Sequence, residues 1–270
     1  MIARYQHATR AITGTRDRQE DACAFAFPDA RALYFTASGR VTGTGELLAV
    51  LADGMGGHVA GAEASRTACA TFIESYAQSE GLTRDRFEAA LTAANAAIAE
   101  RIAHDHNLEG MGSTLVAAAF GDEGLRWVSV GDSPLFLFRQ RRLYQLNEDH
   151  SLAPVLDRLA AEGEIEAEAA RRHPRRHFLR SALTGAEIEL VDLRDRLLPL
   201  EPDDWVVLAS DGIETLSHAE IADIADRHCR SDVDTLVSAL IEAVERADDP
   251  RQDNTTIMAV RPCFAETPVA

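Results

Sequence analysis

The chain has 270 residues, of which 46% are hydrophobic and 26% charged, so it can bury a substantial core and is not disordered. Its formal net charge of −17 argues against binding to nucleic acid or to an anionic membrane surface. The four cysteines are scattered, and no apolar stretch reaches the roughly 20 residues of a membrane span, which predicts a cytoplasmic protein without membrane segments.

Short runs rich in β-branched and aromatic residues predict strands along most of the chain. In chain order they are 22–27, 32–36, 47–52, 114–120, 125–130, 135–139, 188–193, 205–210 and 255–260. Turn residues at 121–124 and at 131–134 separate neighbouring runs by only a few positions. This spacing predicts an antiparallel hairpin at both places.

Helical periodicity occupies separate blocks between these runs. Residues 60–77 predict one helix, and apolar residues at spacings of three and four from Phe87 to Ile102 predict a second. Ser217 and Glu220 form a capping box that begins a third helix, and a fourth covers 236–244. Because strands arrive in runs and helices in pairs, the pattern favours an α+β layered domain over an alternating parallel one.

The chain contains no internal repeat and no obvious linker. We therefore expect a single domain over residues 1–264, followed by a loose tail at 265–270. The stretch 152–180 interrupts the strand rhythm with a short helix, an acidic run and a basic run, which predicts a mobile, flap-like surface subdomain over a site. The basic cluster at 171–176 either balances the adjacent acids or contacts a phosphoprotein.

Carboxylates recur at or beside the ends of the predicted strands. They are Glu20, Asp21, Asp53, Asp132, Asp211 and Asp253. A single Asp-Gly pair is most simply a turn. Strand ends on one edge of a sheet can converge, however, and several carboxylates gathered there would repel one another unless a cation held them. Hard divalent ions such as magnesium or manganese take oxygen ligands of this kind.

Eight short motifs follow one another over nearly the full chain. They are RDRQEDA (16–22), VLADGMGGHVAG (50–61), MGSTLVAA (111–118), VSVGDSPLFLFR (128–139), LNEDHSL (146–152), HPRRHFLRSALTG (173–185), LASDGIETL (208–216) and RQDNTT (251–256). This ordered set resembles the bacterial metal-dependent serine/threonine protein phosphatases of type 2C. The resemblance implies that family's fold, a four-layer α-β-β-α sandwich of two antiparallel sheets flanked by helix pairs.

The resemblance also implies two divalent metal ions, manganese or magnesium. Asp53 matches the residue that bridges the two ions, and the carbonyl of Gly54 would complete one of the two sites. Asp211 and Asp253 match the ligands of the second ion. Asp132 matches a residue that, together with Asp211, forms a third and weaker metal site in bacterial members.

The remaining matched residues imply the chemistry. Glu20 and Asp21 would position metal-bound waters, and Arg16 would grip the substrate phosphate with its bidentate fork. The reaction implied is hydrolysis of phosphoserine or phosphothreonine in a protein, a kinase or a kinase target, by a metal-activated water. The catalytic residues would then be Arg16, Asp53, Asp211 and Asp253. The resemblance implies a monomer and a role for Asn254 in orienting its neighbour Asp253.

Some positions depart from the family pattern. Gln19 replaces an asparagine, Pro134 replaces an arginine, and Met55 stands where some eukaryotic members carry a histidine. His58 lies beside the metal motif and has a structural role more easily than a catalytic one. Two alternatives stay open: a catalytically silent phosphatase fold used as a binding module, and a metal-dependent phosphohydrolase that acts on small molecules.

Overall fold

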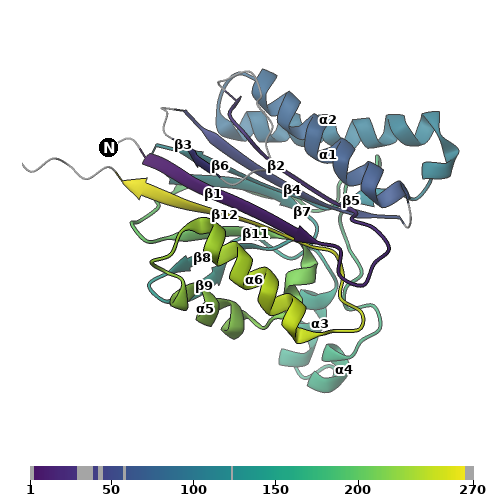
Figure 1. Cartoon of the computed structure of the whole chain (residues 1–270). Coiled ribbons are helices and arrows are strands. Elements are labelled where there is room, and N and C mark those ends of the chain that lie inside the picture. Colours follow the sequence, from purple (N-terminus) through teal and green to yellow (C-terminus); the bar gives the residue numbers. More distant parts are fainter. Residues whose placement is uncertain (1–2, 29–38, 42–44, 57–58, 123, 265–270) are drawn as a thin grey trace, which may run out of the picture.

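Figure 1 shows the computed structural model, which describes residues 3–28, 39–41, 45–56, 59–122 and 124–264. The predicted strand at 32–36, His58 and the predicted tail at 265–270 lie outside these described residues. Within the described ranges, no helix combines the length and the apolar character needed to cross a membrane.

Two antiparallel sheets form the centre of the protein (Figure 1). One has the order β3-β1-β12-β11-β8-β9; its strands are β1 (Ala3–Ile12), β3 (Gly39–Val41), β8 (Leu135–Arg139), β9 (Arg142–Gln145), β11 (Trp205–Ala209) and β12 (Thr255–Phe264). The other has the order β10-β7-β6-β4-β2, with β5 paired to β4. Its strands are β2 (Asp21–Ala26), β4 (Leu47–Met55), β5 (Gly112–Ser113), β6 (Leu115–Gly121), β7 (Gly124–Val130) and β10 (Asp192–Leu198).

A pair of helices covers the outer face of each sheet (Figure 1). Helices α1 (Val59–Gln78) and α2 (Thr83–His104) lie over the sheet that contains β4, whereas α5 (His218–Arg227) and α6 (Val233–Ala247) lie over the sheet that contains β1 and β12. The order helix pair, sheet, sheet, helix pair confirms the four-layer α+β sandwich. Two short helices, α3 (Ala153–Ala161) and α4 (Ala167–Arg171), contact each other at one end of the sandwich (Figure 1).

Strand β4 shows why several strands read as continuous apolar runs. Its alternate residues Leu48, Val50 and Ala52 lie in the core beneath α1 and α2. The intervening residues 47, 49 and 51 lie in the core between the two sheets. Since both faces of the strand are buried, no polar position interrupts the sequence.

Two expectations about strands are wrong in detail. Residues 131–134 do not close a hairpin, because β7 and β8 belong to different sheets. The carbonyl of Pro134 accepts a hydrogen bond from Ala209 N at 3.1 Å, which aligns the chain with β11 of the second sheet. The strand expected at 188–193 begins only at Asp192, because the backbone of Leu190 is bound by the Ser181 hydroxyl instead of by a neighbouring strand.

Candidate active site

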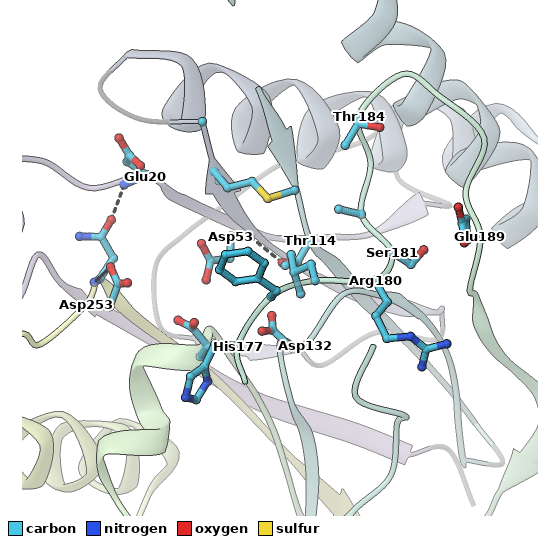
Figure 2. A pocket seen from close by; sticks show the side chains of 18 of the residues that line it. Glu20, Asp53, Thr114, Asp132, His177, Arg180, Ser181, Thr184, Glu189 and Asp253 are labelled. Atoms are coloured by element: carbon cyan, nitrogen blue, oxygen red, sulfur yellow. Dashed lines mark hydrogen bonds between the residues drawn. The ribbon is translucent and has the colours of Figure 1, made fainter. Parts of the chain in front are cut away.

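Carboxylates from both sheets meet at one cavity (Figure 2). Asp53 lies in β4, opposite Asp21 at the start of β2 in the antiparallel register. Asp211 opens the 3-10 turn that follows β11, Asp253 stands two residues before β12, and Asp132 stands two residues after β7. The structure thus brings all the sequence-predicted residues except Asp21 to one cavity of about 670 Å³, and Asp21 lies beside it, opposite Asp53. The cavity is lined by Arg16, Glu20, Asp53, Gly54, Asp132, Asp211 and Asp253.

Burial and mutual repulsion make these carboxyl groups hold their protons more tightly than usual. Burial raises the pKa of Asp21 to about 6, and the charges of Asp211 and Asp253 add to it against hydrogen bonds from the Ser210 and Thr256 side chains. Burial is the main reason that the pKa of Asp53 lies well above its ordinary value, and the charges of four neighbouring aspartates raise it further. The pKa values of Asp132 and Asp211 are raised for the same two reasons.

The donor set fits hard divalent cations. Asp21 Oδ1 is buried and has no hydrogen-bond partner among the described residues, although Asp21 Oδ2 accepts one from Ser210 Oγ at 2.8 Å. A buried, unpartnered carboxylate oxygen among like charges is what a cation would satisfy. In the described part of the chain, no three His, Cys, Asp or Glu side chains are already arranged to hold one ion.

Gly54 allows two backbone segments to approach the metal motif. A Cβ atom on Gly54 would lie 2.1 Å from the carbonyl oxygen of Gly61 and 2.6 Å from that of Glu20. The space that a side chain would fill is thus taken by the first turn of α1 and by the residue before Asp21. The glycine is required for this close packing.

The segment that carries Arg16 is held by Asn254. The Asn254 side chain accepts a hydrogen bond from Glu20 N at 2.7 Å and donates to the carbonyl oxygens of Thr13 and Arg18 at 2.8 and 3.0 Å. The side chain of Asn254 therefore orients the 13–20 segment. Its backbone N–H donates a hydrogen bond to Asp253 Oδ1 at 2.8 Å, so Asn254 also orients its neighbour, as the sequence suggested. The half-exposed guanidinium of Arg16 is ion-paired with Asp253.

One side of the cavity was missed by the sequence analysis. It is formed by His177, Phe178, Leu179, Arg180, Ser181, Ala182, Thr184, Ala186, Glu187 and Glu189. Burial and the charge of Asp253 raise the pKa of Asp211, and the electrostatic effect of His177 opposes them. Figure 2 shows that His177 lies on the same side of the cavity as Asp132, with Ser181 and Thr184 farther along the same segment. The order of the motifs identified the segment 173–185 as part of the family pattern, but no periodicity indicated which of its side chains face the cavity.

Most of the basic cluster is neutralised locally. Arg171 and Arg172 both pair with Glu168 on α4, and Arg176 forms two hydrogen bonds of 2.8 Å with Asp157 on α3. The Arg175 guanidinium lies 5.8 Å from the centre of the Phe178 ring. These pairs support the reading in which the arginines balance the adjacent acids.

Comparison with known sequences now decides the family, because the profile described as Protein phosphatase 2C matches residues 34–249. The chain belongs to the protein phosphatase 2C family. Its curated relatives include the serine/threonine protein phosphatase PstP of Mycobacterium tuberculosis, 34% identical over 79% of this chain and 40% of the relative. They also include the serine/threonine phosphatase stp of Listeria monocytogenes, 35% identical over 63% of this chain and 67% of the relative. The chain thus spans about two fifths of the length of the mycobacterial relative.

Solved structures agree with the family over nearly the whole chain. The crystal structure of M. tuberculosis PstP has a TM-score of 0.75 at 30% identity and covers 96% of this chain and 98% of that one. The catalytic domain of PstP in complex with two manganese ions has a TM-score of 0.74 at 29% identity and covers 97% of this chain and 100% of that one. The four-layer fold seen here is therefore the fold of this family.

Proposed function

We propose that this chain is a metal-dependent phosphatase that hydrolyses phosphoserine and phosphothreonine in proteins. The observation that carries the proposal is the convergence of four aspartates from two sheets on one cavity that Arg16 also lines, with a fifth, Asp21, opposite Asp53. The serine/threonine phosphatases among the relatives, and the two manganese ions of the PstP catalytic domain, support it.

The residues of the cavity would share the metal ions as the family resemblance implies. Asp53 would bridge two manganese or magnesium ions, the Gly54 carbonyl would complete one site, and Asp211 with Asp253 would hold the second ion. Asp132 together with Asp211 would form a third, weaker site. When bound, such ions supply Lewis acidity that makes water a nucleophile at neutral pH.

The protein's own side chains bind and orient the substrate. The Arg16 fork donates to two oxygens of the phosphate, for which it must leave or share its present partner Asp253. Glu20 and Asp21 accept hydrogen bonds from water and direct its lone pair toward phosphorus. Asn254 holds Arg16 and Glu20 near Asp253, because its side-chain amide binds the backbone before and after Arg16.

The cellular setting is part of the same proposal. We infer a cytoplasmic, monomeric enzyme that acts in signalling on a phosphorylated kinase or kinase target. Residues 1–264 would form one phosphatase domain, with 152–180 as a flap-like subdomain beside the cavity. The contact of Arg176 with Asp157 joins the 173–180 segment to α3 and supports a single unit there.

The test is hydrolysis of a phosphothreonine peptide with manganese, with and without chelator. Wild type should turn the peptide over only with metal, and Asp53→Asn should lower the rate by at least about a hundredfold, since it removes the proposed bridge. Asp195→Asn, which alters an exposed carboxylate on β10 outside the cavity, is the matched control. Equal rates for wild type and Asp53→Asn would reject the metal assignment.

Two other outcomes would identify the alternatives. Manganese binding without turnover of any phosphopeptide or small phosphate ester would indicate a silent binding module. Turnover of small esters with no hydrolysis of phosphopeptides would indicate a small-molecule phosphohydrolase.

A further inference from the structure

The cavity has more room than a phosphoryl group needs. Its volume of about 670 Å³ falls in the range of pockets that enclose whole small ligands, roughly 300 to 1,000 Å³. The aspartates and Arg16 line one part of the cavity. The other part is bordered by residues 181–189, here called the wall segment, of which Ser181, Ala182, Thr184, Ala186, Glu187 and Glu189 line the cavity.

The wall segment is irregular in backbone but is fixed at several points. The Ser181 hydroxyl donates to Leu190 O at 2.9 Å and accepts from Leu190 N at 3.0 Å, which closes the segment on itself. Leu183 exchanges two backbone hydrogen bonds of 2.9 Å with Ser113 of β5. Because Ser113 is paired with Gly54 in the register of β5 and β4, the wall segment is joined directly to the metal motif.

Asn95 on α2 makes the third attachment. Its Oδ1 accepts hydrogen bonds from Thr184 N at 3.1 Å and Gly185 N at 2.9 Å, and its Nδ2 donates to Ala186 O at 2.7 Å. Gly185 has a φ of +82°, and a Cβ on it would lie 2.8 Å from Ala99 on the same helix. One amide on α2 therefore fixes three consecutive residues of the wall in a conformation that a side chain at 185 would not permit.

Two exposed side chains of the wall carry negative charge. Glu187 and Glu189 are both exposed and both line the cavity. Arg180 borders the same side, but Figure 2 shows its side chain extending in a different direction from Glu189. A substrate polypeptide that enters the cavity along the wall segment would thus contact two carboxylates beyond the phosphate site.

We propose that the wall segment recognises the polypeptide next to the phosphorylated residue, that Glu187 and Glu189 select basic side chains there, and that Asn95 positions the wall. This proposal depends on the proposed function in one respect: the phosphate of the substrate is taken to bind at the aspartates and Arg16. A rigid, irregular wall needs little ordering when a peptide binds, so its contacts favour binding of the peptide and not of a small phosphate ester.

The charge selection is tested with two fluorescein-labelled phosphothreonine peptides of equal length, flanked on both sides by lysine or by glutamate. Anisotropy with metal removed by chelator measures binding without turnover, and hydrolysis is measured separately in manganese. Wild type should bind the basic peptide at least about threefold more tightly, as expected for exposed charge pairs, and this preference should shrink in high salt. The double variant Glu187→Lys/Glu189→Lys should reverse the preference between the two peptides.

The control is Glu74→Lys/Glu80→Lys, which makes the same charge change at exposed positions that do not line the cavity. It should bind the two peptides as wild type does. Equal binding of both peptides by wild type, or the same preference in the wall variant as in wild type, would overturn the proposal. Absence of hydrolysis with either peptide and with p-nitrophenyl phosphate would instead count against the proposed function, since the binding experiment does not depend on turnover.

The positioning role is tested with Asn95→Ala. The KM for the basic phosphopeptide should rise several-fold, whereas kcat and the KM for p-nitrophenyl phosphate stay within about twofold, because the hydrogen bonds of the Asn95 side chain go to residues 184–186 and not to the residues assigned to the metal ions or the phosphate. Asn95→Asp keeps the acceptor for two amides and should recover part of the peptide KM. Thr92→Ala removes a hydroxyl hydrogen bond one turn earlier on α2 and should change neither KM. Equal losses on both substrates would show a general structural defect and contradict the positioning role.

Discussion

Asp53 combines a fixed backbone with an unfavourable side-chain environment. Its N–H donates to Thr114 Oγ1 at 3.0 Å and its carbonyl accepts from Thr114 N at 2.9 Å, so these two hydrogen bonds fix the backbone of Asp53. Burial and the surrounding aspartates raise the pKa of its carboxyl well above the ordinary value. Without a cation, the ionised side chain therefore opposes folding.

Asp53→Asn should stabilise the metal-free protein. Removing one of several mutually repelling buried carboxylates should raise the free energy of unfolding by roughly 1 to 3 kcal/mol in chelator at neutral pH. Urea denaturation of both proteins in chelator measures this difference. In excess manganese the order should reverse, because only wild type keeps the full ligand set. A variant less stable than wild type in chelator would contradict this account of the cluster.

At the scale of elements, the start of β12 organises the site. Asn254 stands just before this strand and binds the backbone of the 13–20 segment at three points, so the first loop and the last strand of the domain are joined. The Gln252 carbonyl adds a hydrogen bond from Thr15 N at 2.9 Å. The loop that carries Arg16 is thus held by the residues just before β12, in addition to its own local turn bond from Arg16 N to the Thr13 carbonyl at 3.4 Å.

Asn254→Ala should loosen this loop and weaken the protein. Three lost hydrogen bonds at a buried amide should lower the free energy of unfolding by roughly 2 to 4 kcal/mol. Hydrogen exchange at the amides of residues 15–21 should accelerate, whereas exchange in α5 and α6 should change only with global stability. Asn107→Ala, which removes an exposed asparagine amide after α2, is the control. Unchanged protection of residues 15–21 would show that the loop is held elsewhere.

The elements differ in how far the sequence predicts them. The four long helices were predicted because apolar periodicity and caps are local signals, and the Ser217 capping box is present as expected. Helix α4 was not predicted, since its sequence shows only an acidic run followed by a basic one. Strands buried on both faces were located, but an unbroken apolar run does not say to which sheet it belongs, hence the wrong hairpin at 131–134. Short edge strands such as β3 and β9 contain too few apolar residues to be recognised. The wall segment faces the cavity only because Ser113 and Asn95 hold it there, and neither contact has a local signature.

At the scale of the whole molecule, the carboxylate cluster joins the two halves of the sandwich. Asp21 and Asp53 come from one sheet, and Asp211 and Asp253 adjoin strands of the other. Ions shared between these residues would link the sheets across the central core. In their absence the same residues repel one another across that interface, so the stability of the whole domain should depend on metal and on pH together.

Metal-free protein should become less stable as the pH rises from about 4 to about 7. Burial raises the pKa of Asp21 from its ordinary value of 3.8 to about 6. Between these two values the folded state still holds the proton that the unfolded state has released, so the free energy of unfolding falls as pH rises through this window. Asp21 alone should account for on the order of 1 to 3 kcal/mol.

Comparison with Asp21→Asn isolates this contribution from the other carboxylates, because the amide keeps the side-chain volume and does not titrate. In chelator, the difference in melting temperature between Asp21→Asn and wild type should grow from pH 4.5 to pH 7.5 in favour of the variant. With saturating manganese it should shrink or change sign, since bound cations favour the ionised carboxylate. A difference that does not vary with pH in chelator would mean that Asp21 is already ionised at acidic pH. The repulsion between the two sheets would then have to be assigned to Asp53, Asp132 and Asp211 alone.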